Sequence, residues 1–362
     1  MSWFLAFAGF AALIILHELG HFAAAKAVGM RVERFSLFFG RTPLRWQRGE
    51  TEYGVGWLPL GGFVKITGMN PAEEIAPAVA HRAYYRQPVW KRLVVIGAGP
   101  AVNIVLAFLI LMMLFWTTIG DPREVETTNR IEQTTKGTPA AGVLKPGDRI
   151  LTVDGRSGDP DALRKQLASH KCAGTQEDGC KAAEPAVLVV QRGDARLTVE
   201  ATPEYSAQAK RPLLGFAFGS TEAPEVGPLT AAYLSVDQMW RFTTGTVSTI
   251  AQIFKAEKRK ELSGVVGSYE VTRQSIEVGP TQAFFLLAVI SLSLGVINLF
   301  PFLPLDGGHI FWALAEKVRG RAIPFSVMER AGFVGFALVI MLFVIGFTND
   351  IGRLTGEGFG VR

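Results

Sequence analysis

The sequence predicts a polytopic α-helical membrane protein of about four transmembrane helices, with a membrane-associated β-hairpin region on the cytoplasmic side and one extracytoplasmic α+β domain. Two observations carry this prediction. Only 19% of the 362 residues are charged and 49% are hydrophobic, whereas about 25% are charged in an ordinary soluble domain. The charges also cluster, and the gaps between clusters can each hold the roughly 20 apolar residues that span a bilayer. This composition argues against a disordered chain, a collagen and a disulfide scaffold.

Four stretches with few or no charges are predicted to be the transmembrane helices: residues 1–28, 93–120, 280–305 and 331–349. The first stretch could also be a cleaved signal peptide. However, it lacks a basic start and contains polar residues that a discarded peptide does not need. We therefore expect it to remain as the first span.

Basic residues are concentrated in two of the connections between these spans. Residues 29–92 contain ten Lys and Arg, and the connection between the last two spans contains four more, from Lys317 to Arg330. Because cytoplasmic loops carry an excess of Lys and Arg, both connections are expected in the cytoplasm. The two termini and the long region 121–277 then lie outside. The net charge of +5 therefore fits membrane topology better than nucleic-acid binding.

The most specific motif is His17-Glu18-Leu19-Gly20-His21 in the first predicted span. Residues four apart lie on one face of a helix, so His17 and His21 can both reach one zinc ion. Glu18 projects beside them and can take a proton from a metal-bound water. Charged groups inside a membrane span are costly and are usually functional. The alternative is a helix end at the membrane surface, where these polar side chains are simply solvated.

A catalytic zinc ion needs three protein ligands, so a third ligand must come from elsewhere in the chain. His81 and His170 lie in polar loops and are expected to be solvated surface residues. Asp306 and His309 follow two prolines that break the third span, and Gly307-Gly308 between them allows close backbone approach. An aspartate at membrane depth would be an unpaired anion unless it met a cation such as zinc. The alternative is an interfacial loop with an ordinary Asp turn.

The two cysteines, Cys172 and Cys180, lie in a polar, glycine-containing loop of the long outer region. Cysteines in an oxidising compartment can pair, so we expect a disulfide that stiffens this loop. Their spacing is not C-x-x-C, which disfavours both a redox motif and a zinc knuckle. Two free thiols are the alternative.

Together these motifs resemble the bacterial site-2 proteases, zinc intramembrane metalloproteases of the type that cleaves membrane-anchored anti-sigma factors in regulated intramembrane proteolysis. The resemblance covers nearly the whole chain and rests on three segments. His17–His21 and Asn298–Gly308 together are specific to the family, whereas Gly99–Asn103 in the second span matches a weaker G-x-x-x-N pattern. Small residues in that second span also suit helix packing.

The resemblance implies a role for each matching residue. Glu18 corresponds to the general base, and Asn298 corresponds to an asparagine that contacts the substrate backbone. Asn103 matches a position near the active centre, and His309 is at most a supporting residue. The implied ligands of the Zn²⁺ cofactor are His17, His21 and Asp306.

The cytoplasmic loop is expected to form strands with a hairpin. Val32–Phe39 and Tyr53–Ile66 are rich in β-branched and aromatic residues, and the polar stretch Arg45–Glu52 separates them. Within the second run, Pro59–Val64 resembles the family's membrane-dipping β-region, whose edge strand could hold a substrate in extended form. The alternative is a plain amphipathic hairpin at the membrane surface. The residues expected to bind substrate here are Gly61, Gly62 and Phe63.

Residues 122–205 of the outer region resemble one PDZ domain. The resemblance rests on Ala140–Gly155, followed by an expected helix at Pro160–Ala168 and expected strands at Ala186–Gln191 and Ala195–Ala201. PDZ domains bind peptides by strand addition. Such a domain could also act as a size filter that blocks unprocessed substrates, and both roles stay open.

Residues 228–260 carry an apolar pattern that ends in basic residues. This pattern predicts an amphipathic helix that lies on the extracytoplasmic surface of the membrane. A fifth span is the alternative, but Asp237 and Arg241 near the middle argue against it. The following Glu261–Gly267 resembles an S-G-P-x-G turn of the family, with Val265 in the place of proline.

The sequence thus predicts a zinc metalloendopeptidase of the bacterial cytoplasmic membrane. Its expected partners are a single-span membrane protein, such as an anti-sigma factor after a first cleavage, and the lipid bilayer, with no nucleic acid. An intramembrane metal transporter is one alternative, although the fourth span has no charged residue to line a pathway. A proteolytically inactive PDZ scaffold is another, and the intact Glu18 disfavours it.

Overall fold

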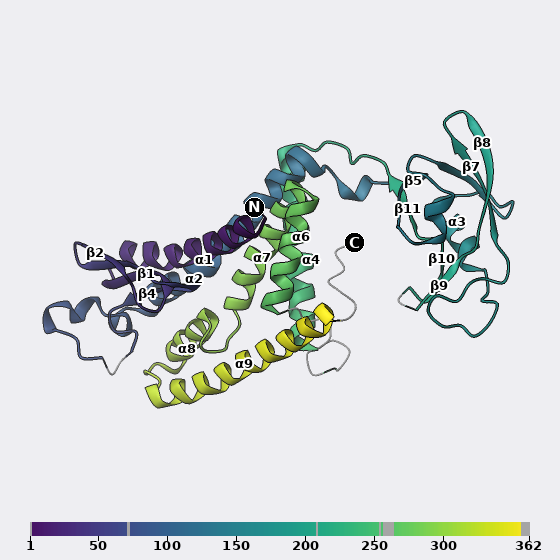
Figure 1. Cartoon of the computed structure of the whole chain (residues 1–362). Coiled ribbons are helices and arrows are strands. Elements are labelled where there is room, and N and C mark those ends of the chain that lie inside the picture. Colours follow the sequence, from purple (N-terminus) through teal and green to yellow (C-terminus); the bar gives the residue numbers. More distant parts are fainter. Residues whose placement is uncertain (1, 71–72, 208, 253–254, 256–263, 356–362) are drawn as a thin grey trace. The chain divides into compact units, whose positions relative to one another are not determined.

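The computed structural model describes residues 2–70, 73–207, 209–252, 255 and 264–355. The chain forms two compact units, one within residues 1–119 and 226–362 and the other within residues 120–225 (Figure 1). We call the second the β-rich unit. The first unit contains the membrane helices and a small sheet, and each unit has a core of its own.

Four helices among the described residues are long and apolar enough to cross a membrane: α1 (Ser2–Ala27), α2 (Val89–Leu114), α7 (Pro280–Asn298) and α9 (Phe325–Thr355). They overlap the four predicted spans, but α2 begins four residues before the predicted start at 93, α7 ends at Asn298 rather than at 305, and α9 extends beyond 331–349 at both ends. A single turn of π-helix, Phe115–Ile119, continues α2. The protein is therefore a multi-pass membrane protein.

Helix α2 packs against both α1 and α7 through glycines. A Cβ atom on Gly20 of α1 would lie 2.7 Å from the carbonyl oxygen of Ala98, and one on Gly295 of α7 would lie 3.0 Å from that of Pro100. These backbones approach closely because neither glycine has a side chain, as is typical of membrane helix packing.

The loop between α1 and α2 folds into a four-stranded sheet of β1 (Val32–Phe39), β2 (Leu44–Arg48), β3 (Thr51–Val55) and β4 (Leu58–Ile66). The strand order is β2-β3-β1-β4, with β1 parallel to β3 and antiparallel to β4. The expected simple hairpin is therefore wrong in detail. The polar stretch Arg45–Glu52 is itself mostly strand, and the run Tyr53–Ile66 divides into β3 and β4. All five residues of β2 are exposed although apolar and polar residues alternate from Leu44 to Gln47, so the alternation does not mark a buried face here.

The described part of this unit also contains the α-helices α4 (Pro228–Ala251), α6 (Val265–Val278) and α8 (Asp306–Arg319). The amphipathic helix predicted at 228–260 corresponds to α4, and residues 253–254 and 256–260 of that prediction lie outside the described residues. Helix α4 does not lie apart from the spans, because Ala231 and Leu234 are buried against α2 and α7. Of the predicted turn Glu261–Gly267, only residues 264–267 are described, and the N–H groups of Gly264 and Gly267 donate to the Asp350 carboxylate of α9.

The β-rich unit is a five-stranded sheet with one helix, α3 (Pro160–Ala168), whose bounds match the prediction. Asp159 caps α3 by accepting a hydrogen bond from the Ala162 N–H at 2.7 Å, and Pro160 occupies the first helical position. The unit extends to Glu225, beyond the predicted boundary at 205, because the last strand pairs next to the first. In sheet order the strands are β11 (Phe216–Ser220), β5 (Thr127–Thr134), β6 (Arg149–Val153), β7 (Ala186–Arg192) and β8 (Ala195–Ala201).

Two short strands, β9 (Glu204–Ser206) and β10 (Arg211–Leu213), form a separate ribbon in the same unit. The structure joins Cys172 and Cys180 in a disulfide, with Cα atoms 5.8 Å apart. The bridge closes the loop between α3 and β7.

Candidate metal centre

Three side chains from two helices converge on one point in the membrane-helix unit. His17 and His21 lie one turn apart on α1, and their Nε2 atoms are 3.2 Å apart. The Oδ2 atom of Asp306, the first residue of α8, lies 3.2 Å from each of these nitrogens. Both histidines are buried, and together the three residues form a cluster able to hold a metal ion.

The geometry of this triangle fits a zinc ion. Bonds of about 2.0–2.2 Å in a tetrahedral site place neighbouring ligand atoms roughly 3.3 Å apart. His21 Nδ1 lies 2.9 Å from the carbonyl oxygen of Val95, to which it must donate, so in the neutral imidazole that binds metals the lone pair is on Nε2. That lone pair faces a carboxylate oxygen, Asp306 Oδ2, which is buried and has no hydrogen-bond partner among the described residues. A cation between these atoms would remove their repulsion.

Helix α2 provides the wall behind the triangle. Gly99 lies directly against the imidazole of His21, and a Cβ atom there would collide with the ring. Val95, one turn earlier on the same face of α2, orients the ring through its carbonyl oxygen. The small residue and the carbonyl together hold the imidazole in one place.

A cavity of about 580 Å³ opens in front of the three residues. Glu18 lines it beside the two histidines, as the motif predicts. Gly62 of β4 is so close that a Cβ atom on it would lie 3.0 Å from Glu18 Cγ. Gly61, Phe63 and Asn298 also line the cavity, so the structure brings most of the predicted site residues together.

Comparison with known proteins agrees with this geometry. The model of peptidase family M50 matches residues 5–342. The chain belongs to peptidase family M50. The zinc metalloprotease Rip1 of Mycolicibacterium smegmatis is 33% identical, with 89% of this chain and 87% of the relative covered. The regulator of sigma-W protease RasP of Bacillus subtilis is 25% identical over 95% of this chain and 97% of its own.

The predicted resemblance to site-2 proteases is therefore confirmed, and the chain is a zinc metalloendopeptidase. Zn²⁺ is accordingly its cofactor. Membership of the M50 family also favours the peptidase over the transporter and scaffold alternatives.

Asn103 lies outside the cavity lining of this M50 peptidase. Its side chain is fully buried between α2 and α7, and neither amide atom has a hydrogen-bond partner among the described residues. Its backbone carbonyl accepts a hydrogen bond of 2.8 Å from the hydroxyl of Ser291. The structure therefore places Asn103 one helical turn beyond Gly99, in a helix interface.

The other histidines lie away from the triangle. His309 lines a separate cavity of about 170 Å³ together with Arg92 and Glu316. His81 is exposed, as expected. His170 is not simply solvated, because its Nε2 lies 2.9 Å from the Asp154 carboxylate within the β-rich unit.

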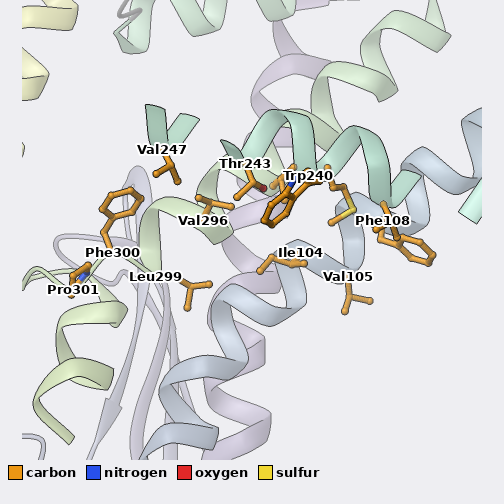
Figure 2. A pocket seen from close by; sticks show the side chains of 13 residues that line it. Ile104, Val105, Phe108, Trp240, Thr243, Val247, Val296, Leu299, Phe300 and Pro301 are labelled. Atoms are coloured by element: carbon orange, nitrogen blue, oxygen red, sulfur yellow. The ribbon is translucent and has the colours of Figure 1, made fainter. Parts of the chain in front are cut away.

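A larger cavity of about 700 Å³ lies between α2, α4 and α7 (Figure 2). Figure 2 shows Ile104 and Val105 of α2 on one side and Trp240 of α4 on another. Apart from Thr243, the lining is apolar and offers no carboxylate, imidazole or thiol. This cavity is therefore not a candidate for the hydrolytic chemistry.

Sequence reasoning missed two contributions to the metal centre. Val95 acts through its backbone carbonyl, which every residue type carries, so no sequence signal could reveal it. The glycine of the G-x-x-x-N pattern was noted, but its contact with His21 joins α1 to α2 and depends on how the helices pack.

Proposed function

We propose that the peptidase hydrolyses a peptide bond in the transmembrane segment of a single-span membrane protein. His17, His21 and Asp306 are its zinc ligands and Glu18 is its general base. One observation carries the proposal. The two imidazole nitrogens and the carboxylate oxygen form a triangle in which each pair of atoms is 3.2 Å apart. Two of its three corners lie on α1, a helix long and apolar enough to cross a membrane.

The roles proposed for the zinc ion and for Glu18 follow from the positions of the side chains. Zinc held by these ligands would polarise the scissile carbonyl and lower the pKa of water. Glu18 accepts the proton of the attacking water and delivers it to the leaving amine. It lines the cavity next to the ligands, and Gly62 of the neighbouring strand β4 leaves room for its side chain because glycine has no Cβ.

The β4 strand is proposed to hold the substrate. A peptide bond within a helix is shielded, so the scissile segment must become extended before it can be attacked. β4 lies at the edge of its sheet and pairs on one side with β1, and no described strand pairs with its other side. Gly61, Gly62 and Phe63 of this strand line the cavity, where strand addition would present an extended substrate to Glu18. Asn298 lines the same cavity and would contact the substrate backbone.

The substrate class and topology extend the same proposal. A relative covering nearly the whole chain is named a regulator of sigma-W protease, which favours an anti-sigma factor, already shortened by a first cleavage, as the substrate. We propose that the protein lies in the bacterial cytoplasmic membrane, with the four-stranded sheet in the cytoplasm and the β-rich unit and both termini outside. The excess of Lys and Arg in the connections supports this orientation. The β-rich unit is then the single PDZ domain.

The test separates metal binding from proton transfer. Glu18→Gln is expected to retain zinc and to lose cleavage of a model transmembrane substrate, because the amide keeps the shape but cannot accept the proton. Asp306→Asn is expected to lower the zinc content of the purified protein. Glu329→Gln, an exposed change on α9, is the matched control and should alter neither quantity. Full cleavage by Glu18→Gln would refute the proposed mechanism.

A further inference from the structure

An ion pair joins α2 to α8 away from the metal centre. The two terminal nitrogens of Arg92 donate to the two carboxylate oxygens of Glu316 at 2.8 and 2.7 Å. The Arg92 side chain is only 9% exposed and that of Glu316 is 28% exposed. Such a two-bond pairing fixes orientation as well as distance, and partial burial strengthens it.

Each partner lies on the helix face that also serves the metal centre. On α8, the spacing from Asp306 to Ala313 and on to Glu316 keeps all three on one side of the helix. On α2, Arg92 lies one turn before Val95 and Ile96 and two turns before Gly99. One face of α2 therefore contacts His21 through Gly99 and, two turns earlier, contacts Glu316 of α8 through Arg92.

Little else in the immediate surroundings holds the Asp306 side chain. It follows a broken segment, the preceding Leu305 provides no side-chain cap for α8, and its Oδ2 atom lies 3.2 Å from each histidine Nε2 with no donor elsewhere among the described residues. The backbone around Gly307 and Gly308 packs against residues 299–303, which locates the start of α8. The direction of the helix from that start is set by its other contacts with α2.

We propose that Arg92 and Glu316 are positioning residues that fix α8 on α2 and thereby hold Asp306 at bonding distance from the two histidines. The inference rests on the proposed ligand set. Asp306 and Glu316 are ten residues apart, or about 15 Å of helix. Over that length, a tilt of roughly one degree shifts one end by the roughly 0.2 Å that metal–ligand distances tolerate. A loosened α8 therefore weakens zinc binding even though neither Arg92 nor Glu316 touches the metal.

The test measures zinc release from the full-length protein in detergent, with an excess of a colorimetric chelator. Removing a direct outer partner of a metal ligand lowers metal affinity about 10–100-fold. Glu316 acts through the position of α8 rather than on a ligand directly, so Glu316→Ala is expected to release zinc about 10-fold faster than the wild type, the lower end of that range. Glu316→Gln keeps the shape of the side chain and one acceptor oxygen, so its zinc release rate should lie between those of the wild type and Glu316→Ala. Glu329→Gln removes an exposed acid from α9 and should stay within about twofold of the wild type, because outside the site surface changes have small effects.

Thermal unfolding of the same samples separates positioning from general stability, because zinc release is measured well below every unfolding midpoint. Wild-type release rates in both Glu316 variants, with or without a lower midpoint, would overturn the inference. Where Glu316→Ala does not fold, Glu316→Gln carries the test alone. Unchanged zinc affinity in Asp306→Asn would instead refute the ligand set. This result does not depend on how the Glu316 variants behave, so the two failures can be told apart.

Discussion

Replacing Gly99 by alanine tests the packing of the metal centre most directly. The added Cβ would lie 2.6 Å from His21 Cε1 and 2.8 Å from His21 Cδ2. Carbon atoms in contact prefer about 3.5–4.0 Å, so the ring must move by roughly 1 Å. If α1 and α2 separated instead, the close packing of the Gly20 backbone on the Ala98 carbonyl would be lost.

The displacement is several times larger than the roughly 0.2 Å that metal–ligand distances tolerate. It also strains the 2.9 Å hydrogen bond from His21 to the Val95 carbonyl. Loss of such an outer partner alone costs about 10–100-fold in metal affinity. Displacing the ligand itself should cost at least the upper end of that range, about 100-fold or about 2.8 kcal/mol.

The matched control lies two residues earlier on the same helix. A Cβ atom on Gly97 would meet no atom within 4 Å. Gly97→Ala should therefore leave zinc binding unchanged and stabilise α2 by up to about 1 kcal/mol, because alanine favours a helix over glycine. Both substitutions replace glycine by alanine, so the chemical change is the same. Gly99→Ala should weaken zinc binding, whereas Gly97→Ala should leave zinc binding unchanged and raise stability.

The assay is the zinc content of purified protein by mass spectrometry, together with cleavage of a transmembrane substrate and the thermal unfolding midpoint. Gly99→Ala should lose zinc and activity, and Gly97→Ala should keep both. Full zinc occupancy and activity in Gly99→Ala would refute the packing of His21 on α2. Equal losses of zinc and activity in both variants would show that they arise from a change in α2 as a whole and not from the contact between Gly99 and His21.

Three further outcomes follow from other contacts. Gly62→Ala should lower the turnover number severalfold at unchanged zinc content, because the new Cβ would lie 3.0 Å from Glu18 Cγ; normal turnover would contradict this contact. Asp350→Ala should lower the unfolding midpoint by the equivalent of about 0.5–2 kcal/mol, since two N–H groups at the start of α6 lose their acceptor; an unchanged midpoint would argue against that cap. In the β-rich unit, hydrogen bonds from Arg192 hold the pKa of Asp148 below its usual range, so the pair stabilises above about pH 4 and the stabilisation is lost as the pH falls through the lowered pKa. Asp148→Asn should increase proteolysis of residues 120–225 relative to the wild type at pH 7, and this ratio should approach one in acid; a ratio independent of pH would contradict the ion pair.

Local patterns in the sequence determined the membrane helices, part of the metal site and much of the β-rich unit. Long uncharged stretches predict spans because their burial in lipid needs no partner. The four-residue spacing of His17 and His21 places them on one helix face for the same local reason. The bounds predicted for α3 match the structure, and its start is fixed by Asp159 and Pro160, which act within one turn.

Tertiary structure alone decided which distant groups meet. The sequence showed that Asp306 needs a cation, but only the packing of α8 places its oxygen 3.2 Å from each histidine. The contact of Gly99 with His21 and the pairing of Arg92 with Glu316 each join separate helices. Strand β2 is exposed at every residue and has no buried face, so its place in the sheet depends on its pairing with β3. Periodicity reports the face of a single element, whereas the choice of partner depends on shape and charge across the whole fold.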